Sequence, residues 1–125
     1  MRLPSLAILA LLVPSIAFAH GPSKGPNGGQ VQDVGPYHVE LVVNEPNIAV
    51  HVTDAKDKPV DVAGAKGTAI VLANKKQESI VLHPSANALH GHGTFAAAND
   101  MQVVVSITLP DGKPLQAKFA SARAN

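Results

Sequence analysis

The sequence contains no cysteine and no tryptophan, and aromatic residues make up only 3% of its 125 residues. Without cysteine, neither a disulfide framework nor a thiolate metal site is available. A chain of this length forms one domain, and about a hundred residues bury enough apolar surface to fold without cross-links. Because aromatic side chains are so few, the core must consist of Val, Ile, Leu and Ala, which suits a thin β-sandwich.

Long hydrophobic runs are also lacking. The apolar run Leu6–Val13 is far shorter than the roughly 17 residues that a membrane span needs. It follows a basic start at Met1–Arg2 and precedes Ala17–Ala19, an A-x-A cleavage signal. We therefore expect residues 1–19 to be a secretory signal peptide and the mature protein to begin at His20 in the periplasm. No cysteine follows the cleavage point, so no lipoprotein or other membrane anchor is expected after cleavage.

The sequence also lacks an excess of charge of either sign. The sequence has ten Lys and Arg and nine Asp and Glu, and Arg2 is lost with the signal peptide. This balance argues against a nucleic-acid partner, which normally requires a basic face. No nucleophile motif such as G-x-S-x-G occurs, and no glycine-rich phosphate loop. We therefore expect a protein that is not an enzyme.

Alternating apolar residues predict a β-hairpin over Pro36–Thr53, interrupted by a turn at Asn44–Asn47. If that turn forms the loop, the residue numbers of directly opposed partners on the two strands add up to 91. His51 then lies opposite Glu40 on the outer face. A one-residue slip would bury His51, so the hydrophobic pattern favours this register. The inner face is then expected to consist of Val39, Leu41, Val43, Ile48, Val50 and Val52.

The rest of the chain has turn residues at short spacing and no helical period. Residues 20–29 hold four Gly and two Pro and are expected to form a flexible segment that buries nothing. Residues 121–125 are expected to be a polar tail. Residues 30–120 form the domain, an all-β antiparallel sandwich or small barrel of about seven to eight strands. Besides the hairpin, strands are expected at Gln30–Val34, Thr68–Ala73, Gln77–His83, Ala88–Phe95, Met101–Leu109 and Pro114–Ala120.

Six histidines stand out in this composition, because neutral imidazole is the commonest protein metal ligand and suits copper, zinc and nickel. Cleavage after Ala19 makes His20 the mature N-terminus. Its α-amine and imidazole, with the Gly21 amide, can chelate one Cu(II), whereas Pro22 has no N–H to extend the amide ligands. The alternative is that His20 is simply the first residue of a disordered tail.

A second group is His38, Glu40 and His51 from the hairpin. Two imidazoles and a carboxylate at neighbouring positions of two paired strands can form a three-ligand site for a divalent ion. The alternative is a surface Glu–His pair of little energetic weight, with the other His as a solvated neighbour.

The third group is His83, His90 and His92. Pairing Leu82 with Leu89 places all three imidazoles on one face, where His90 and His92 are two residues apart on the same strand. Such a pair can bridge one ion, but it can also be ordinary exposed surface. We expect this group to lie on a separate edge of the domain from the hairpin group.

Several short motifs resemble those of a known family. They are Gly25–Gly29 (GPNGG), Asp33–Val42, Lys58–Asp61, the Leu-x-Gly-x-Gly-x-Phe pattern of 89–95, and the Leu-Pro-Asp-Gly-Lys-Pro turn at 109–114. In these the chain resembles the small N-terminal β-domain of the periplasmic adaptor subunits of heavy-metal efflux RND pumps. It is also similar to free-standing periplasmic proteins that consist of this domain. The resemblance implies a periplasmic role in metal handling beside an efflux complex, but it fixes no ligand, and the long helical hairpin of the adaptors is absent.

The leading hypothesis is thus a soluble periplasmic metal-binding protein that holds a divalent ion for efflux or buffering, with copper favoured and zinc and nickel as alternatives. The alternative is an interaction module that docks on an efflux or envelope complex without specific metal binding.

Overall fold

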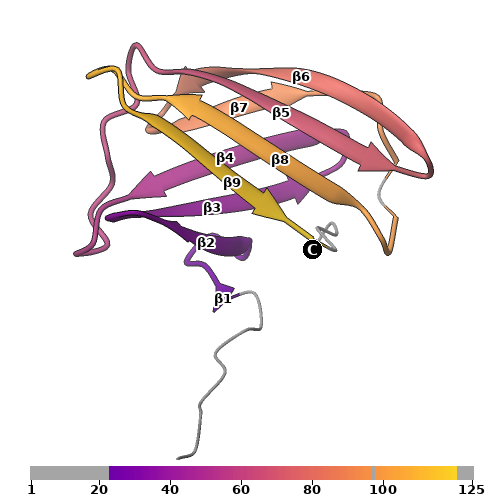
Figure 1. Cartoon of the computed structure of the whole chain (residues 1–125), viewed down its shortest axis with the longest axis horizontal. Coiled ribbons are helices and arrows are strands. Elements are labelled where there is room, and N and C mark those ends of the chain that lie inside the picture. Colours follow the sequence, from indigo (N-terminus) through magenta and orange to yellow (C-terminus); the bar gives the residue numbers. More distant parts are fainter. Residues whose placement is uncertain (1–22, 97, 121–125) are drawn as a thin grey trace, which may run out of the picture.

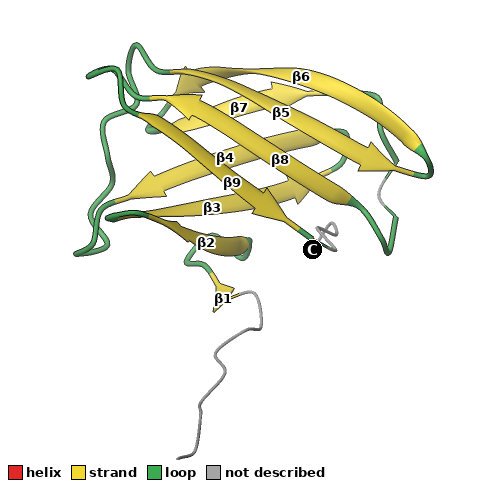
Figure 2. Cartoon of the chain, in the orientation of Figure 1, coloured by secondary structure: helices red, strands yellow, loops and turns green. Residues whose placement is uncertain are grey.

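The computed structural model describes residues 23–96 and 98–120, and within these ranges the chain forms nine antiparallel strands and no helix (Figures 1 and 2). Consequently this part of the protein offers no helix with the length and apolarity to cross a bilayer. The strands are β1 (Ser23–Lys24), β2 (Gln30–Val34), β3 (Tyr37–Asn44), β4 (Asn47–Thr53), β5 (Lys66–Ala73), β6 (Lys76–Ser85), β7 (Ala88–His92), β8 (Gln102–Thr108) and β9 (Pro114–Phe119).

The strands join in the order β1-β2-β3-β4-β7-β6-β5-β8-β9. β2 and β9 lie near the two ends of this order and contact each other, so the sheet curls into a nearly closed barrel. In Figure 1, β3 and β4 cross β8 and β9 at an angle. Residues of both groups of strands belong to the buried core cluster. The predicted all-β antiparallel fold is confirmed.

The hairpin formed by β3 and β4 has the predicted register, with Glu40 opposite His51 and Val43 opposite Ile48. Its turn is shorter than expected, because Asn44 pairs with Asn47 and only Glu45 and Pro46 connect the strands. The whole predicted inner row is at most 3% exposed: Val39, Leu41, Val43, Ile48, Val50 and Val52.

Aliphatic side chains fill the barrel, as the lack of aromatic residues requires. Phe119 is the one aromatic residue of the buried core cluster. Tyr37 and Phe95 are half-buried and pack against this cluster. On β5, β8 and β9 buried and exposed residues alternate along each strand. Each of these strands therefore presents one face to the core and the other to solvent.

The segment before Gln30 differs from the flexible lead-in that its composition suggested. β1 pairs with β2 through Ser23–Val31 and Lys24–Gln30. The Gly25 N–H donates to the carbonyl oxygen of Gly29 at 2.8 Å, which closes a tight turn over β3. Gly29 is buried, and an added Cβ at this position would overlap the carbonyl group of Leu41. The glycines thus allow a close backbone approach, and the turn covers part of the barrel.

The pairing of β6 with β7 also differs from the prediction. Leu89 pairs with Pro84, not with Leu82, and His83 lies directly opposite His90. The turn is correspondingly tighter, with Ala86 and Asn87 at positive φ between Ser85 and Ala88. Because the shift is two residues, every side chain keeps its predicted face.

Candidate metal centre

All five histidines of the described residues project outward from four adjacent strands. They alternate with buried aliphatic residues, which fixes them on the outer face of the sheet. They are His38 on β3, His51 on β4, His90 and His92 on β7, and His83 on β6. We call this surface the histidine face. His20 lies outside the described residues.

The two predicted strand groups are neighbours, which corrects the expectation that they lie on separate edges. β4 pairs directly with β7, with Ala49 opposite His90 and Asn47 opposite His92. His51 is two residues from Ala49, so it lies diagonal to His90, at the roughly 7–8 Å expected of such neighbours. The histidines therefore form a continuous track across the face.

The tightest part of this track is the group of His83, His90 and His92. His83 and His90 are directly opposed, a position in which Cβ atoms lie roughly 4.5–5.5 Å apart. His92 is on the same face of β7, two residues from His90. All three line one surface hollow of about 350 Å³, together with Asn47 and Ser85.

Hydrogen bonds orient two of these rings. His92 Nδ1 lies 2.7 Å from Asn47 Oδ1, and His90 Nε2 lies 3.1 Å from the carbonyl oxygen of Ser85. An oxygen of either kind only accepts, so the ring nitrogen beside it bears the proton. The other nitrogen of each neutral ring, His92 Nε2 and His90 Nδ1, keeps its lone pair. Metal-ligating imidazoles in proteins are typically held in this way.

Glu40 has a different role from the one that its position suggested. Its side chain is 4% exposed, although it lies on the outer face, because the Gly25–Gly29 turn covers it. Its carboxylate accepts three hydrogen bonds at 2.9 Å, from the backbone N–H groups of Asn27 and Gly29 and from Asn27 Nδ2. We therefore leave Glu40 out of the metal site and assign it the role of fastening the N-terminal turn.

His38 contacts two aspartates instead of Glu40. Its Nδ1 lies 2.6 Å from Asp33 Oδ1 on β2, and its Nε2 lies 3.7 Å from Asp57 Oδ1 in the loop after β4. Asp33 could have been found from the sequence, because a two-residue turn at Gly35–Pro36 sets it opposite His38. Asp57 had no such signal, since it comes from a polar loop whose path the pattern does not determine.

In the residues that the structure describes, no three His, Asp or Glu side chains converge as a ready metal site. The strands fix the face on which His83, His90 and His92 lie, and a shared ion would require their imidazole rings to turn from the orientations that the hydrogen bonds give them.

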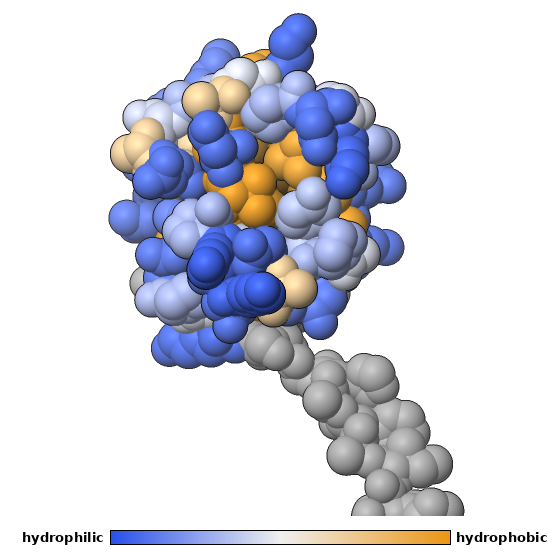
Figure 3. Space-filling model, turned by 90° about the vertical axis from the view of Figure 1, so that its left-hand side faces the viewer, coloured by the Kyte–Doolittle hydropathy of each residue, from blue (hydrophilic) through white to orange (hydrophobic). Residues whose placement is uncertain are grey.

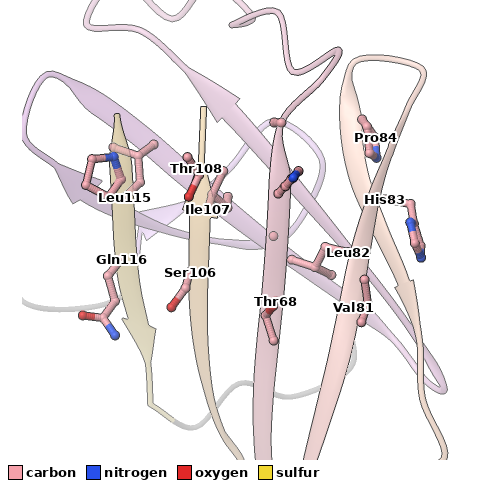
Figure 4. A pocket seen from close by; sticks show the side chains of 14 residues that line it. Thr68, Val81, Leu82, His83, Pro84, Ser106, Ile107, Thr108, Leu115 and Gln116 are labelled. Carbon is pink, nitrogen blue, oxygen red and sulfur yellow. The ribbon is translucent and has the colours of Figure 1, made fainter. Parts of the chain in front are cut away.

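A pocket of about 850 Å³ lies across the ends of β5, β6, β8 and β9, and His83 at the end of the track is one of its lining residues (Figure 4). Leu82, Ile107 and Leu115 contribute to its apolar lining, and no acidic residue lines it. Figure 3 shows apolar residues at the centre of the barrel end that includes the β8–β9 turn, ringed by hydrophilic ones.

The loop that holds Asp57 depends on an ionised carboxylate, which gives a prediction for its pH dependence. The backbone N–H groups of Lys58 and Lys56 donate to Asp54 Oδ1 and hold the pKa of Asp54 below its ordinary value of 3.8. The loop is therefore stabilised above this ordinary value, and that contribution is lost as pH falls through the lowered pKa. We expect the amide chemical shifts of Lys56 and Lys58 to titrate in NMR spectra with a midpoint below 3.8. A midpoint at or above that value, or the same titration in Asp54→Ala, would contradict this.

Comparison of the chain with family models, with curated proteins and with solved structures finds no match, so its function is argued from its own residues.

Proposed function

We propose that this protein is a periplasmic metal-binding protein that holds Cu(II), or a similar divalent ion, on the histidine face. The main site consists of His83, His90 and His92. The observation that supports this most directly is the cross-strand pair His83–His90 with His92 beside it, all three lining one hollow.

The donor chemistry favours copper. Three neutral imidazoles suit copper, zinc and nickel, and affinity for divalent first-row ions at nitrogen sites is greatest for Cu(II). The side chains of His83, His90 and His92 are exposed, so the ion stays accessible to water and to a second protein. An accessible site suits storage or transfer of an ion better than a structural role, which normally uses a closed coordination sphere.

The predicted signal peptide and the family resemblance support a role in the periplasm beside an efflux complex. The signal sequence directs the chain to the periplasm, and the likeness to adaptor β-domains suggests a heavy-metal efflux complex as the recipient of the ion. The protein acts as a carrier or buffer in this proposal, and it catalyses no reaction.

An interaction module remains the second candidate, and one observation favours it. Ile70, Leu72 and Val81 are large apolar side chains that are 37%, 43% and 60% exposed. They lie on β5 and β6, whose outer face has no acidic residue among its outward positions. An exposed apolar patch of this kind commonly marks a protein contact.

Calorimetric titration of the mature chain with Cu(II), Zn(II) and Ni(II) separates the two candidates. We expect saturable binding, tightest for Cu(II), which is lost when His83, His90 and His92 are all replaced by alanine. Replacement of His20 by alanine in a chain whose N-terminus is acetylated removes both the imidazole and the free α-amine, and so the contribution of the N-terminal chelate. If the triple variant binds Cu(II) as the wild type does in that background, the strand site is not real.

A further inference from the structure

His38 faces two carboxylates that come from different parts of the chain. Asp33 lies opposite it on β2, and Asp57 approaches from the loop between β4 and β5. The three side chains line a hollow of about 540 Å³ on the outer face, next to the Gly25–Gly29 turn. None of them belongs to the hollow of His83, His90 and His92.

The two contacts of the His38 ring differ in length, and the difference is informative. At 2.6 Å from Asp33 Oδ1, Nδ1 donates its proton to a carboxylate, which leaves the lone pair of the neutral ring on Nε2. The 3.7 Å from Nε2 to Asp57 Oδ1 is too long for a hydrogen bond. It is slightly longer than the separation of two ligands on one ion, because bonds of about 2.0–2.2 Å at the tetrahedral angle place nitrogen and oxygen about 3.3–3.6 Å apart.

Asp57 is held in place by its loop. Its N–H donates to the carbonyl oxygen of Asp54 at 3.0 Å, while the carboxylate of Asp54 binds the N–H groups of Lys56 and Lys58. Asp57 itself adopts φ 61°, a left-handed conformation that is uncommon outside Gly, Asn and Asp. The loop thus presents this carboxylate toward the ring of His38.

The charges around this hollow favour a cation. Asp33 and Asp57 contribute two carboxylates, and Lys24 is the one lysine in the lining. The buried carboxylate of Glu40 adds further negative charge, although its oxygens already accept three hydrogen bonds. A divalent ion at His38 and Asp57 would offset this excess.

We propose that His38 and Asp57 bind a divalent ion with mixed nitrogen and oxygen ligands, such as Zn(II), and that water completes the coordination sphere. Asp33 is a positioning residue, because it fixes the proton on Nδ1 and thereby directs the lone pair of Nε2 at the ion. This second site shares no ligand with the three-histidine site, so it stands independently of the proposed function.

The test is NMR titration of the mature chain with Zn(II), in the variant in which His83, His90 and His92 are replaced by alanine. We expect the ¹⁵N resonance of His38 Nε2 to shift on addition of zinc. Asp57→Asn is expected to weaken this binding at least tenfold, and asparagine tolerates positive φ, so the loop keeps its path. The matched control is Asp61→Asn, an exposed aspartate of the same loop whose Oδ1 accepts only from the N–H of Ala63 among the hydrogen bonds of the described chain.

Asp33→Ala, which removes the acceptor altogether, tests the positioning role separately. We expect about 10–100-fold weaker zinc binding, as for other outer-shell partners, together with a change in the tautomer of His38 seen in ¹⁵N spectra without metal. An unshifted His38 Nε2 at saturating zinc, or equal affinities for Asp57→Asn and Asp61→Asn, would overturn the site. Because the three histidines are absent from this background, neither result depends on whether the proposed copper site exists.

Discussion

Replacement of His90 by alanine is expected to produce the largest loss of Cu(II) affinity among single variants of the histidine face. His90 is directly opposite His83 and is followed on the same face by His92, so its removal takes away the middle ligand of the group. Loss of an outer-shell partner alone typically costs about 10–100-fold in metal affinity, and we expect loss of this ligand to exceed that range. Calorimetry at constant buffer and salt measures the effect.

His51→Ala is the matched control for that variant. His51 belongs to the same face and lies diagonal to His90, but it is outside the hollow that the three histidines line. We expect at most a small change in Cu(II) affinity when it is replaced. Equal losses for the two variants would show that the ion is shared along the whole track, and a larger loss at His51 would move the site to the hairpin.

The sequence predicted the register of the β3–β4 hairpin because two independent signals agreed there. The apolar residues Val39, Leu41 and Val43 at every second position fixed which side chains face the core, and the Asn and Pro residues located the turn. A slip of one residue would have reversed the faces of the strand, so the hydrophobic pattern determined the pairing of Glu40 with His51.

The same reasoning could not determine the β6–β7 pairing. A shift of two residues moves Leu89 from Leu82 to Pro84 without turning any side chain over, so the hydrophobic pattern is identical in both registers. The faces of the three histidines were therefore predicted correctly, while their partners were not. The order of the strands in the sheet could not be predicted from the hydrophobic pattern either. The pairing of β4 with β7 is what brings the two histidine groups together.

Burial of Glu40 was missed for a different reason. A carboxylate next to outward-facing histidines resembles a ligand, and a segment with four Gly and two Pro resembles a disordered lead-in. The carboxylate and the glycine-rich segment were interpreted separately, although they form one feature. The turn supplies the N–H donors that the buried carboxylate requires. A turn of this kind forms no core, and hydrophobic patterns do not report it.

Replacement of Glu40 by alanine is expected to destabilise the fold by about 2–4 kcal/mol, because it leaves buried and partly buried donors of Asn27 and Gly29 without their acceptor. The midpoint of urea unfolding measures this loss. Glu40→Gln keeps the shape and one acceptor oxygen, so we expect it to fall between the wild type and Glu40→Ala. Wild-type stability for Glu40→Ala would show that the Gly25–Gly29 turn is not fastened by this carboxylate.

A double-mutant cycle with Gly25 makes the same point more sharply. A Cβ at Gly25 would overlap the Glu40 carboxyl group, and the three nearest atoms it meets all belong to that side chain. Gly25→Ala is therefore expected to be strongly destabilising alone but nearly neutral when Glu40 is already alanine, a coupling of about 1–3 kcal/mol. Gly29→Ala is the matched control, because its Cβ would meet the backbone carbonyl of Leu41. We expect its cost to remain in both backgrounds, and additive effects of Gly25→Ala and Glu40→Ala would contradict the direct contact between the turn and the carboxylate.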